Sequence, residues 1–585
     1  MAFVSEGKAR LELFDARALP AAPRLERVSF ENLTDPEQGC DLLIVAHGAF
    51  REMAETLAAH HQAQGWRSRV VDIQAVYDQF SDGELSPAAI RALLATALRR
   101  WKAGAPGQVL LVGDCTADYL GEARGGVRNW VPSYTFSEGG DSFASDYWFT
   151  RVSGIDNLGD FMIGRLPVAS REDAQAVVNK ILTYEDRSQP GPWRARLGYV
   201  ADQGEFPEVL DDLRRKATPQ AYAAERVFLN EYPLEDNWYL PQQLVDSKEM
   251  KVSSRATAGI GRMLRQGVAF LSYYGHGSPN IWSNERMWFG GGSVNSDNLM
   301  LKDSGTYAFV ANMTCNSGAI DYPLSPWNIC ITEDLLRVPG GGAIACYVPS
   351  GPGVTMLHRN MSQELQRAMF QDGLRRFGEI VTAAKARYLI DGSPDELVSM
   401  YLLLGDPAAA LQMTSRRGRF DPKPGTAAPG EPLRMELTGI EPPSGRWTGE
   451  LVTDENLRLW SSPPADYADG RIALDADVPT TAPTGHAILR LYCWAPGARG
   501  DPSDLALAGD LRVETPYVAL GELRATKSAD GSIRAEITVN NPTTHKGSGR
   551  LEAWIEDAAG SHTLLSETVR GATWRELTFK PESGA

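Results

Sequence analysis

Short apolar runs alternate with amphipathic stretches along the first two thirds of the chain. The runs at 41–47 (DLLIVAH) and 108–114 (QVLLVGD) have the length and composition of buried strands, whereas 51–65 and 86–101 repeat apolar residues with the period of a helix. Further strands are predicted at 68–73, 161–168, 197–202, 268–277, 306–315 and 341–350. Because strands separated by helices favour right-handed crossovers, the pattern predicts a mostly parallel sheet that helices cover on both faces.

Two of the predicted helices have clear start signals. Ser86 is an expected N-cap, and Pro87 follows it at the first helical position, where the missing N–H costs nothing. Ser170 is a second expected N-cap, with Asp173 three residues later. The apolar residues of this second helix fall on one face: Ala174, Val177, Val178, Ile181 and Leu182.

The chain divides into several predicted units. The Pro- and Gly-containing stretch 188–193 is interpreted as a linker between two α/β subdomains, 41–190 and 191–413, each with its own mostly parallel sheet. Residues 1–40 precede them as an extension or the remnant of a pro-segment. The fold class is therefore α/β for the larger part of the chain.

The pattern changes after about residue 413. Proline and glycine become dense, and short alternating segments with turn signals replace the helical period, which is typical of β-sandwiches. We expect an immunoglobulin-like sandwich at 414–510 and a second β-sandwich, whole or incomplete, at 511–585, with the Pro- and Gly-rich stretch 494–504 as the divider.

Composition narrows the class of protein. The 585 residues are 43% hydrophobic and 23% charged, as in ordinary globular proteins, and the net charge is −16. An acidic surface repels phosphate backbones and anionic lipid, so nucleic acid and membranes are poor partner candidates. No apolar run reaches the ~18 residues that a bilayer requires. The first residues lack the features of a secretory signal, so we expect either an intracellular protein or a chain whose leader has been removed.

Six cysteines are spread along the chain without a C-x-x-C pair, which favours neither a zinc site nor a disulfide framework. Most are expected to be buried. Cys315 differs, because it follows an apolar run directly and precedes Asn, Ser and Gly. His276 stands between two glycines at the end of the preceding predicted strand, 39 residues earlier. Adjacent parallel strands end at the same edge of a sheet, so the two side chains are predicted to face each other there.

This pair suits nucleophilic catalysis. A free thiol titrates near pH ~8.5, and a nearby imidazole can take its proton or stabilise the thiolate. Gly277 would let a substrate backbone approach, and its N–H with that of Cys315 could stabilise an oxyanion, each donor being worth ~2.7–4 kcal/mol. Asp202 also ends a predicted strand, where its carboxylate could accept a hydrogen bond from the imidazole.

Several alternatives stay open. His47 also ends a strand and competes as the base, although it belongs to the first subdomain, and Cys115 ends another strand without a histidine nearby in the sequence. His276 could instead cap a helix, and Asp202 could belong to a solvated acidic surface with its acidic neighbours. Asp156 and Asp160 could ligate calcium or could form a plain turn.

The stretches LSYYGHGSPNIW and ANMTCNSG resemble the gingipain-type cysteine peptidases, peptidase family C25 of the caspase-like clan. VLLVGD, SDYWFT, FMIGRLPV, YVAD and LLLGDPAAALQ occur in the family's order, so the resemblance spans about 41–413. It implies that Cys315 is the nucleophile, that His276 transfers protons, that the N–H groups of Gly277 and Cys315 form the oxyanion hole and that Asp202 is the acidic partner. It also implies an immunoglobulin-like domain behind the catalytic part, and an extracellular or cell-surface location in a bacterium, with the cytoplasm as the alternative.

The resemblance leaves the specificity open. Gingipains cut after Arg or Lys with an acidic pocket, and the loop 349–360 offers no carboxylate, but Glu205 or Glu208 could supply one. The expected function is endopeptidase action on a protein or peptide substrate, with no required cofactor and calcium as a possible structural ion. A sortase-like transpeptidase and an inert scaffold protein are the alternatives. The sequence does not determine the oligomeric state.

Overall fold

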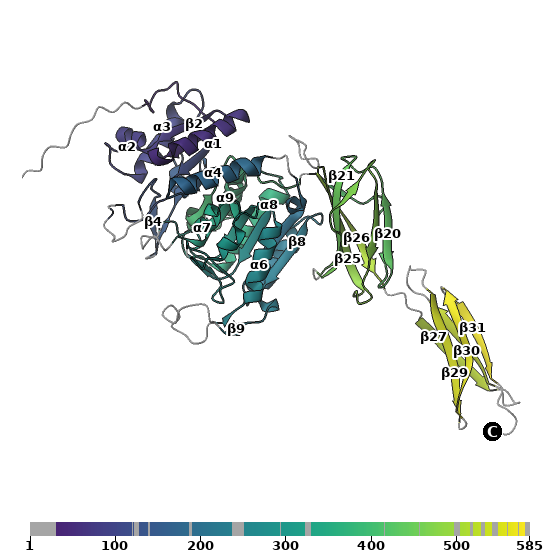
Figure 1. The fold of residues 1–585 in the computed structure, drawn as a ribbon. Coiled ribbons are helices and arrows are strands. Elements are labelled where there is room, and N and C mark those ends of the chain that lie inside the picture. The colour runs from purple at the N-terminus through teal and green to yellow at the C-terminus, as the bar shows by residue number, and fades with distance from the viewer. Residues whose placement is uncertain are drawn as a thin grey trace, which may run out of the picture.

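The computed structural model describes residues 31–579 except for 120, 122–127, 139–140, 187–189, 237–250, 293, 322–328, 415, 455–456, 496–503, 515–518, 528–532, 541–547, 558–559 and 571–572. An α/β body is followed by two all-β units along the chain (Figure 1). In the described part of the chain, no helix is long and apolar enough to cross a membrane.

The α/β body is built on one ten-stranded sheet. Its strands, in spatial order, are β2 (Ser68–Asp72), β1 (Leu42–Ala46), β3 (Gln108–Val112), β6 (Met162–Leu166), β17 (Tyr401–Leu404), β16 (Ala343–Pro349), β15 (Ala308–Met313), β11 (Phe270–Tyr274), β7 (Arg196–Ala201) and β8 (Ala223–Phe228). Neighbouring strands are parallel, except that β17 runs antiparallel to β16. The predicted parallel α/β sheet is confirmed.

The two predicted subdomains share this sheet, so the expectation of a separate sheet for each is corrected. Strand β17 comes last in the α/β part of the chain but lies between β6 of the first half and β16 of the second. It pairs with β6 through Leu404 and Arg165, and Gly405 N donates to the carbonyl of Arg165 at 2.7 Å. Because β17 forms hydrogen bonds on both edges, the two halves become one continuous sheet.

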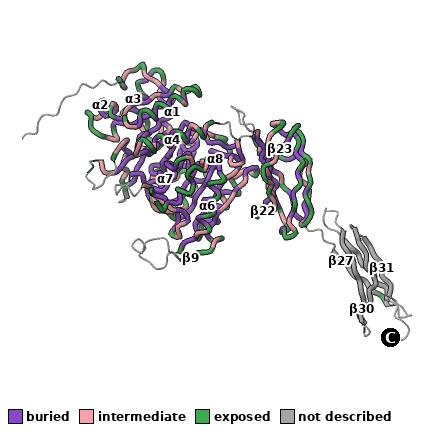
Figure 2. Tube along the Cα trace, viewed as in Figure 1, coloured by how far each residue is buried: buried purple, intermediate pink, exposed green. Residues whose placement is uncertain are grey.

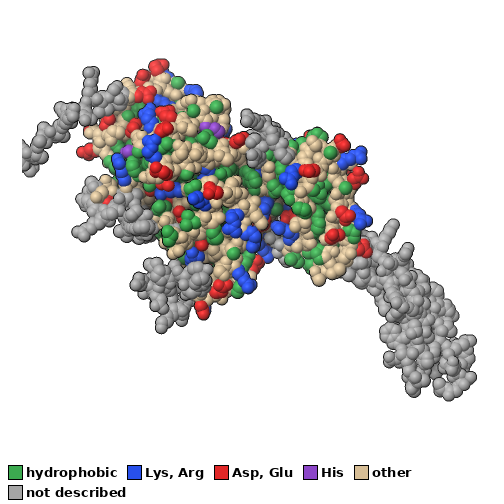
Figure 3. Space-filling model, in the orientation of Figure 1, with side chains coloured by type: hydrophobic (Ala, Val, Ile, Leu, Met, Phe, Trp, Pro, Cys, Tyr) green, Lys and Arg blue, Asp and Glu red, His purple; other side chains and the backbone are tan. Residues whose placement is uncertain are grey.

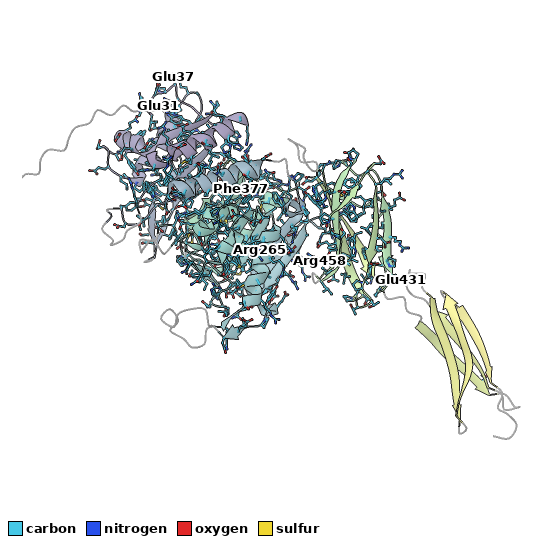
Figure 4. All side chains as sticks on the ribbon, in the orientation of Figure 1. Glu31, Glu37, Arg265, Phe377, Glu431 and Arg458 are labelled. Atoms are coloured by element: carbon cyan, nitrogen blue, oxygen red, sulfur yellow. The ribbon has the colours of Figure 1, made fainter. Side chains whose placement is uncertain are left out.

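Helices cover both faces of the sheet, and the strands between them are buried (Figure 2). They are α1 (Arg51–Ala63), α2 (Ile73–Phe80), α3 (Pro87–Arg100), α4 (Arg171–Glu185), α5 (Phe206–Ala217), α6 (Ser254–Gln266), α7 (Ile331–Arg337), α8 (Thr355–Phe370), α9 (Phe377–Ile390) and α10 (Asp395–Met400). The Ser170 hydroxyl accepts from Asp173 N at 3.0 Å, as predicted. Ser86 is the N-cap of α3, but its side chain makes no capping bond. At the start of α9, Phe377 packs on Phe309 of β15, with ring centroids 5.0 Å apart (Figure 4).

The region after the α/β body is all-β, as predicted. A seven-stranded sheet contains β18 (Arg417–Arg419), β19 (Thr426–Ala427), β21 (Gly445–Thr453), β22 (Arg458–Ser461), β23 (Ala465–Tyr467), β25 (Gly485–Trp494) and β26 (Asp504–Val513). A second sheet pairs β20 (Pro432–Leu437) with β24 (Ile472–Asp477). Strand β26 pairs with β25, so 494–504 joins two strands of one sheet, and its interpretation as a divider was wrong. The finer assignment to the immunoglobulin-like class stays a prediction.

The last unit contains a three-stranded sheet and a hairpin (Figure 1). The sheet is formed by β27 (Ala519–Lys527), β28 (Ile533–Asn540) and β31 (Thr573–Phe579), and the hairpin by β29 (Ser548–Asp557) and β30 (Gly560–Arg570). Of the predicted N-terminal extension 1–40, residues 1–30 lie outside the described residues.

The first β unit packs against the α/β body. Tyr492 and Trp494 belong to the same hydrophobic cluster as the central sheet. Tyr222 donates from its hydroxyl to Thr414 O at 2.6 Å, and Arg490 Nε donates to Gln220 O at 2.6 Å. Lys and Arg side chains gather at this junction (Figure 3), where Arg458 lies (Figure 4). Buried apolar area and hydrogen bonds both hold the two units together.

A buried ion pair between His61 and Asp406 ties α1 to the segment after β17, with Nε2 and Oδ2 2.6 Å apart. Burial lowers the pKa of His61, but Asp406 and Glu185 outweigh burial, so this pKa lies above its ordinary value. A raised folded-state pKa contributes stability that is complete below the unfolded value of about 6.5 and is lost as the pH rises through the folded value. We therefore expect the free energy of unfolding to fall as the pH rises above about 6.5, as measured by urea denaturation.

The matched variant for this prediction is Asp406→Asn, which keeps the shape of the side chain and removes its charge. The fall in unfolding free energy above about pH 6.5 should shrink in this variant. A pH profile identical to that of the wild type would show that the pair does not produce the effect.

Candidate active site

Three strands of the second half of the sheet end side by side at one edge. The register pairs Ala201 of β7 with Tyr274 of β11, and Tyr274 with Met313 of β15. The backbone bonds continue past the strands, since Asp202 N donates to Tyr274 O at 3.0 Å and Gly275 N donates to Met313 O at 3.3 Å. His276 and Cys315 each lie two residues beyond the last paired position, so the register brings them to neighbouring places at this edge.

Gly277 lies directly against the segment that carries Cys315. A Cβ at Gly277 would lie 2.4 Å from Thr314 Oγ1 and 3.3 Å from Cys315 O. A side chain at this position would displace the side chain of Thr314, which explains the glycine. The structure thus brings together the predicted residues His276, Gly277 and Cys315.

The N–H of Gly277 points away from its neighbouring strand. Gly277 begins the short strand β12 (Gly277–Ser278), which pairs antiparallel with β13 (Ile281–Trp282), and β13 pairs with β14 (Trp288–Phe289). Ser283 N donates to His276 O at 2.9 Å, which makes that position a hydrogen-bonded one. Hydrogen bonds alternate along an antiparallel pair, so the next N–H, that of Gly277, faces the outer edge of β12.

Asp202 is buried beside His276, but it holds the backbone of His276 instead of the ring. Its Oδ2 accepts from His276 N at 3.1 Å, and its Oδ1 accepts from Gln203 N at 2.7 Å. Burial raises the pKa of Asp202, and the hydrogen bonds that it accepts oppose this rise. The sequence suggested a ring nitrogen as the partner, whereas the structure shows this carboxylate bonded to the backbone N–H of His276.

Aromatic side chains also fix the His276 segment. The imidazole is exposed and meets Phe206 edge-on, with centroids 5.0 Å apart. The Tyr273 hydroxyl donates to His276 O at 2.5 Å, and the Tyr273 ring stacks on Trp282 at 4.5 Å. His276 is therefore exposed to solvent, while hydrogen bonds with neighbouring residues fix its backbone.

Cys315 is the one cysteine of the six that is not buried. Its Sγ accepts from Gly353 N at 3.5 Å and lies 3.7 Å from Gly353 O. The next residue, Asn316, has a φ of 53°, which turns the chain sharply after Cys315. Burial raises the pKa of every other cysteine, to about 12 for Cys346, so those thiols stay protonated at neutral pH.

The competing residues lie elsewhere. His47 follows β1, five strands away from β15 in the sheet, and its Nδ1 accepts from Ala49 N as a helix cap. Burial also lowers the pKa of His47. Cys115 is buried, with its Sγ 4.0 Å from Ile320 O.

The predicted pocket residues flank Phe206 at the start of α5. Glu205 and Glu208 are both exposed, and the charge of Glu205 contributes to the raised pKa of Tyr274, after burial. Val354, the last residue of the loop after β16, and Met356, in the first turn of α8, are 60% and 56% exposed. The exposed side chains are therefore acidic at the start of α5 and apolar at the start of α8.

The proposed calcium ligands are engaged in their own loop. Asp160 Oδ2 accepts from Val152 N and Ser153 N, and Asp156 Oδ1 accepts from Leu158 N. These bonds fit the alternative of a plain turn. Among the described residues, no three His, Cys, Asp or Glu side chains are grouped as metal ligands.

Sequence reasoning missed Gly353 as a neighbour of the thiol. The stretch that contains it, PSGPG, was considered only for carboxylates. The pattern that could have identified Gly353 is a glycine-rich turn directly after a buried strand, which is also the pattern at His276.

Comparison with known proteins agrees with this geometry. The model of peptidase family C25 matches residues 35–412. The Arg-specific cysteine proteinase gingipain R (RGPB) is 15% identical with a TM-score of 0.50, over 83% of this chain and 100% of that one. The complex of the RgpB pro- and mature domains of Porphyromonas gingivalis is 15% identical with a TM-score of 0.49, over 81% and 100%. No curated protein sequence matches the chain. The resemblance deduced from the motifs is confirmed, and the chain belongs to peptidase family C25, a family of cysteine peptidases.

Proposed function

We propose that the protein is a cysteine endopeptidase that hydrolyses peptide bonds with Cys315 and His276 through an acyl-enzyme. The observation that carries this proposal is the register of β11 and β15, which brings the single accessible thiol and an exposed imidazole to adjacent strand ends. A thiol needs a nearby base because only a few per cent of it is ionised at neutral pH.

The proposed reaction uses groups of this edge only. His276 takes the proton of Cys315, and Sγ attacks the peptide carbonyl. The N–H groups of Gly277 and Cys315 donate to the oxyanion that forms. His276 then protonates the leaving amine, the C–N bond breaks, and water hydrolyses the thioester. Asp202 holds the backbone of His276 in place throughout.

Covalent labelling tests this proposal. A peptidyl chloromethyl ketone should modify the protein once, and peptide mapping by mass spectrometry should place the adduct on Cys315. The five buried thiols are internal controls, because burial raises their pKa and blocks access. An adduct on another cysteine, or no adduct, would contradict the proposal.

The alternatives predict different products. A transpeptidase would give aminolysis products when glycine amide competes with water for the acyl-enzyme, whereas the proposed hydrolase gives mainly acid. His276 is exposed, so water reaches the proposed base, and this favours hydrolysis. An inert scaffold would give neither product and no label. An extracellular or cell-surface location in a bacterium is part of the same proposal.

We expect Glu205 and Glu208 to favour a basic residue before the cleaved bond. The double substitution E205Q/E208Q should lower kcat/KM for Arg and Lys substrates about tenfold and leave Leu substrates unchanged, because exposed charges contribute up to ~1 kcal/mol each. E172Q, on the exposed surface of α4, is the control. Equal losses for Arg and Leu substrates would contradict the assignment. A wild-type preference for apolar residues would instead assign the pocket to Val354 and Met356.

A further inference from the structure

The loop 350–354 connects β16 to α8 and passes over the thiol of Cys315. Its Gly353 N lies closer to Sγ than its Gly353 O does, at 3.5 Å against 3.7 Å. The N–H suits a thiolate, whereas the carbonyl suits a protonated thiol. A hydrogen bond to an ionised acceptor is roughly twice as strong as a neutral one, so the contact from the Gly353 N–H strengthens when Sγ is ionised.

Behind Gly353 stands a buried histidine that the proposed reaction does not use. His358 of α8 is 3% exposed, and its Nδ1 lies 2.6 Å from the Tyr401 hydroxyl of β17. That hydroxyl donates to Asn312 O of β15 at 3.0 Å. The ring of His358 is thus locked to the two strands β15 and β17.

The other ring nitrogen of His358 faces Gly353. Nε2 is buried and has no hydrogen-bond partner among the described residues. A Cβ at Gly353 would lie 1.9 Å from this nitrogen and 2.5 Å from the adjacent Cε1. The φ of Gly353 is not in the left-handed region, so only the contact with His358, and not backbone strain, excludes a side chain here.

We propose that His358, fixed by Tyr401, is a positioning residue. It sets the distance between the Gly353 N–H and Cys315 Sγ, so that this N–H stabilises the thiolate. The proposal rests on the proposed function in assigning Cys315 as the nucleophile. It adds a hydrogen-bond donor to the thiolate, Gly353, and the residue that positions this donor, His358. Gly353 follows β16 and the proposed oxyanion donor Gly277 follows β11, and these two strands flank β15, which precedes Cys315.

The alkylation rate of Cys315 by iodoacetamide as a function of pH tests this proposal on the full chain. The titratable groups around the thiol are His276, Tyr273 and Tyr401, and burial holds the pKa of both tyrosines well above neutrality. His276 is unchanged in every variant. Differences between variants then report the environment of Sγ.

G353A should slow alkylation about tenfold near neutral pH, because the new methyl group pushes the loop and its N–H away from Sγ. H358A should slow alkylation as well, since the loop loses its support. In the double variant the methyl group occupies the space that the ring left. We therefore expect the double variant G353A/H358A to be alkylated at least as fast as the slower of the two single variants. If the two substitutions acted independently, their factors of slowing would multiply.

Two further variants separate this proposal from simple damage to the fold. G107A is the control, because a Cβ at Gly107 meets no atom within 4 Å. Y401F removes the hydroxyl that bonds both His358 and Asn312 O, and it should slow alkylation in a protein that still unfolds in one cooperative transition. If G353A does not fold, the alkylation profile of Y401F is the test of the proposal. Unchanged alkylation profiles in G353A or Y401F, or single effects that multiply in the double variant, would overturn the proposal. Alkylation by iodoacetamide requires no peptide substrate. A lack of peptidase activity would therefore contradict the proposed function, whereas the alkylation rates would still test the role of His358.

Discussion

Replacing Cys315 with alanine should abolish peptidase activity. Removal of a catalytic nucleophile typically lowers kcat on the order of 10⁴–10⁶-fold, because the remaining site can only bind and polarise the substrate. The five other thiols cannot substitute for it, since they are buried and their pKa values are raised. The measurement is cleavage of a proteome-derived peptide library, followed by kcat/KM for the best peptide found.

C346A is the matched control for C315A. Cys346 lies in the adjacent strand β16 and is fully buried, so its replacement tests the loss of a thiol near the site without the loss of the accessible one. This variant should keep activity within a few-fold, provided that its unfolding midpoint shows a folded protein. Activity that survives in C315A, or that disappears equally in both variants, would remove Cys315 from its assigned role.

The second large effect is expected on stability, at the seam between the two halves of the sheet. Arg165 of β6 is fully buried and donates to Asp146 at 2.7 and 2.8 Å. It also donates to the carbonyls of Gly113, Val131 and Pro132. R165M should lower the free energy of unfolding by about 3–5 kcal/mol, because it leaves the carboxylate of Asp146 buried without its counter-ion. Urea denaturation, with hydrogen exchange at β6 and β17, measures this change.

R171M is the control for that substitution. Arg171 pairs with Glu52 on the surface, where the two side chains are 59% and 73% exposed. An exposed pair of this kind contributes ~0–1 kcal/mol, so the unfolding free energy should hardly change. If R165M and R171M destabilised the protein equally, burial of the Arg165–Asp146 pair would not be the source of the larger effect.

The strands and helices followed from local patterns. Apolar runs placed β1, β3, β11, β15 and β16 within a few residues of their observed bounds, because burial on both faces leaves a continuous apolar signal in the sequence. The same patterns predicted the candidate pair, since His276 and Cys315 each stand where an apolar run meets glycine or small polar residues. These features depend on residues that are close together in the chain.

The tertiary structure decided which strands are neighbours and what each side chain contacts. A four-residue strand, β17, joins both halves into one sheet, although nothing in its own sequence names β6 and β16 as its partners. Asp202 bonds the backbone of His276 and not its ring, and Gly353 meets Cys315 from a loop 38 residues further along the chain. Periodicity reports the environment of one segment, whereas pairing and packing depend on contacts between distant segments, and only the folded chain brings those together.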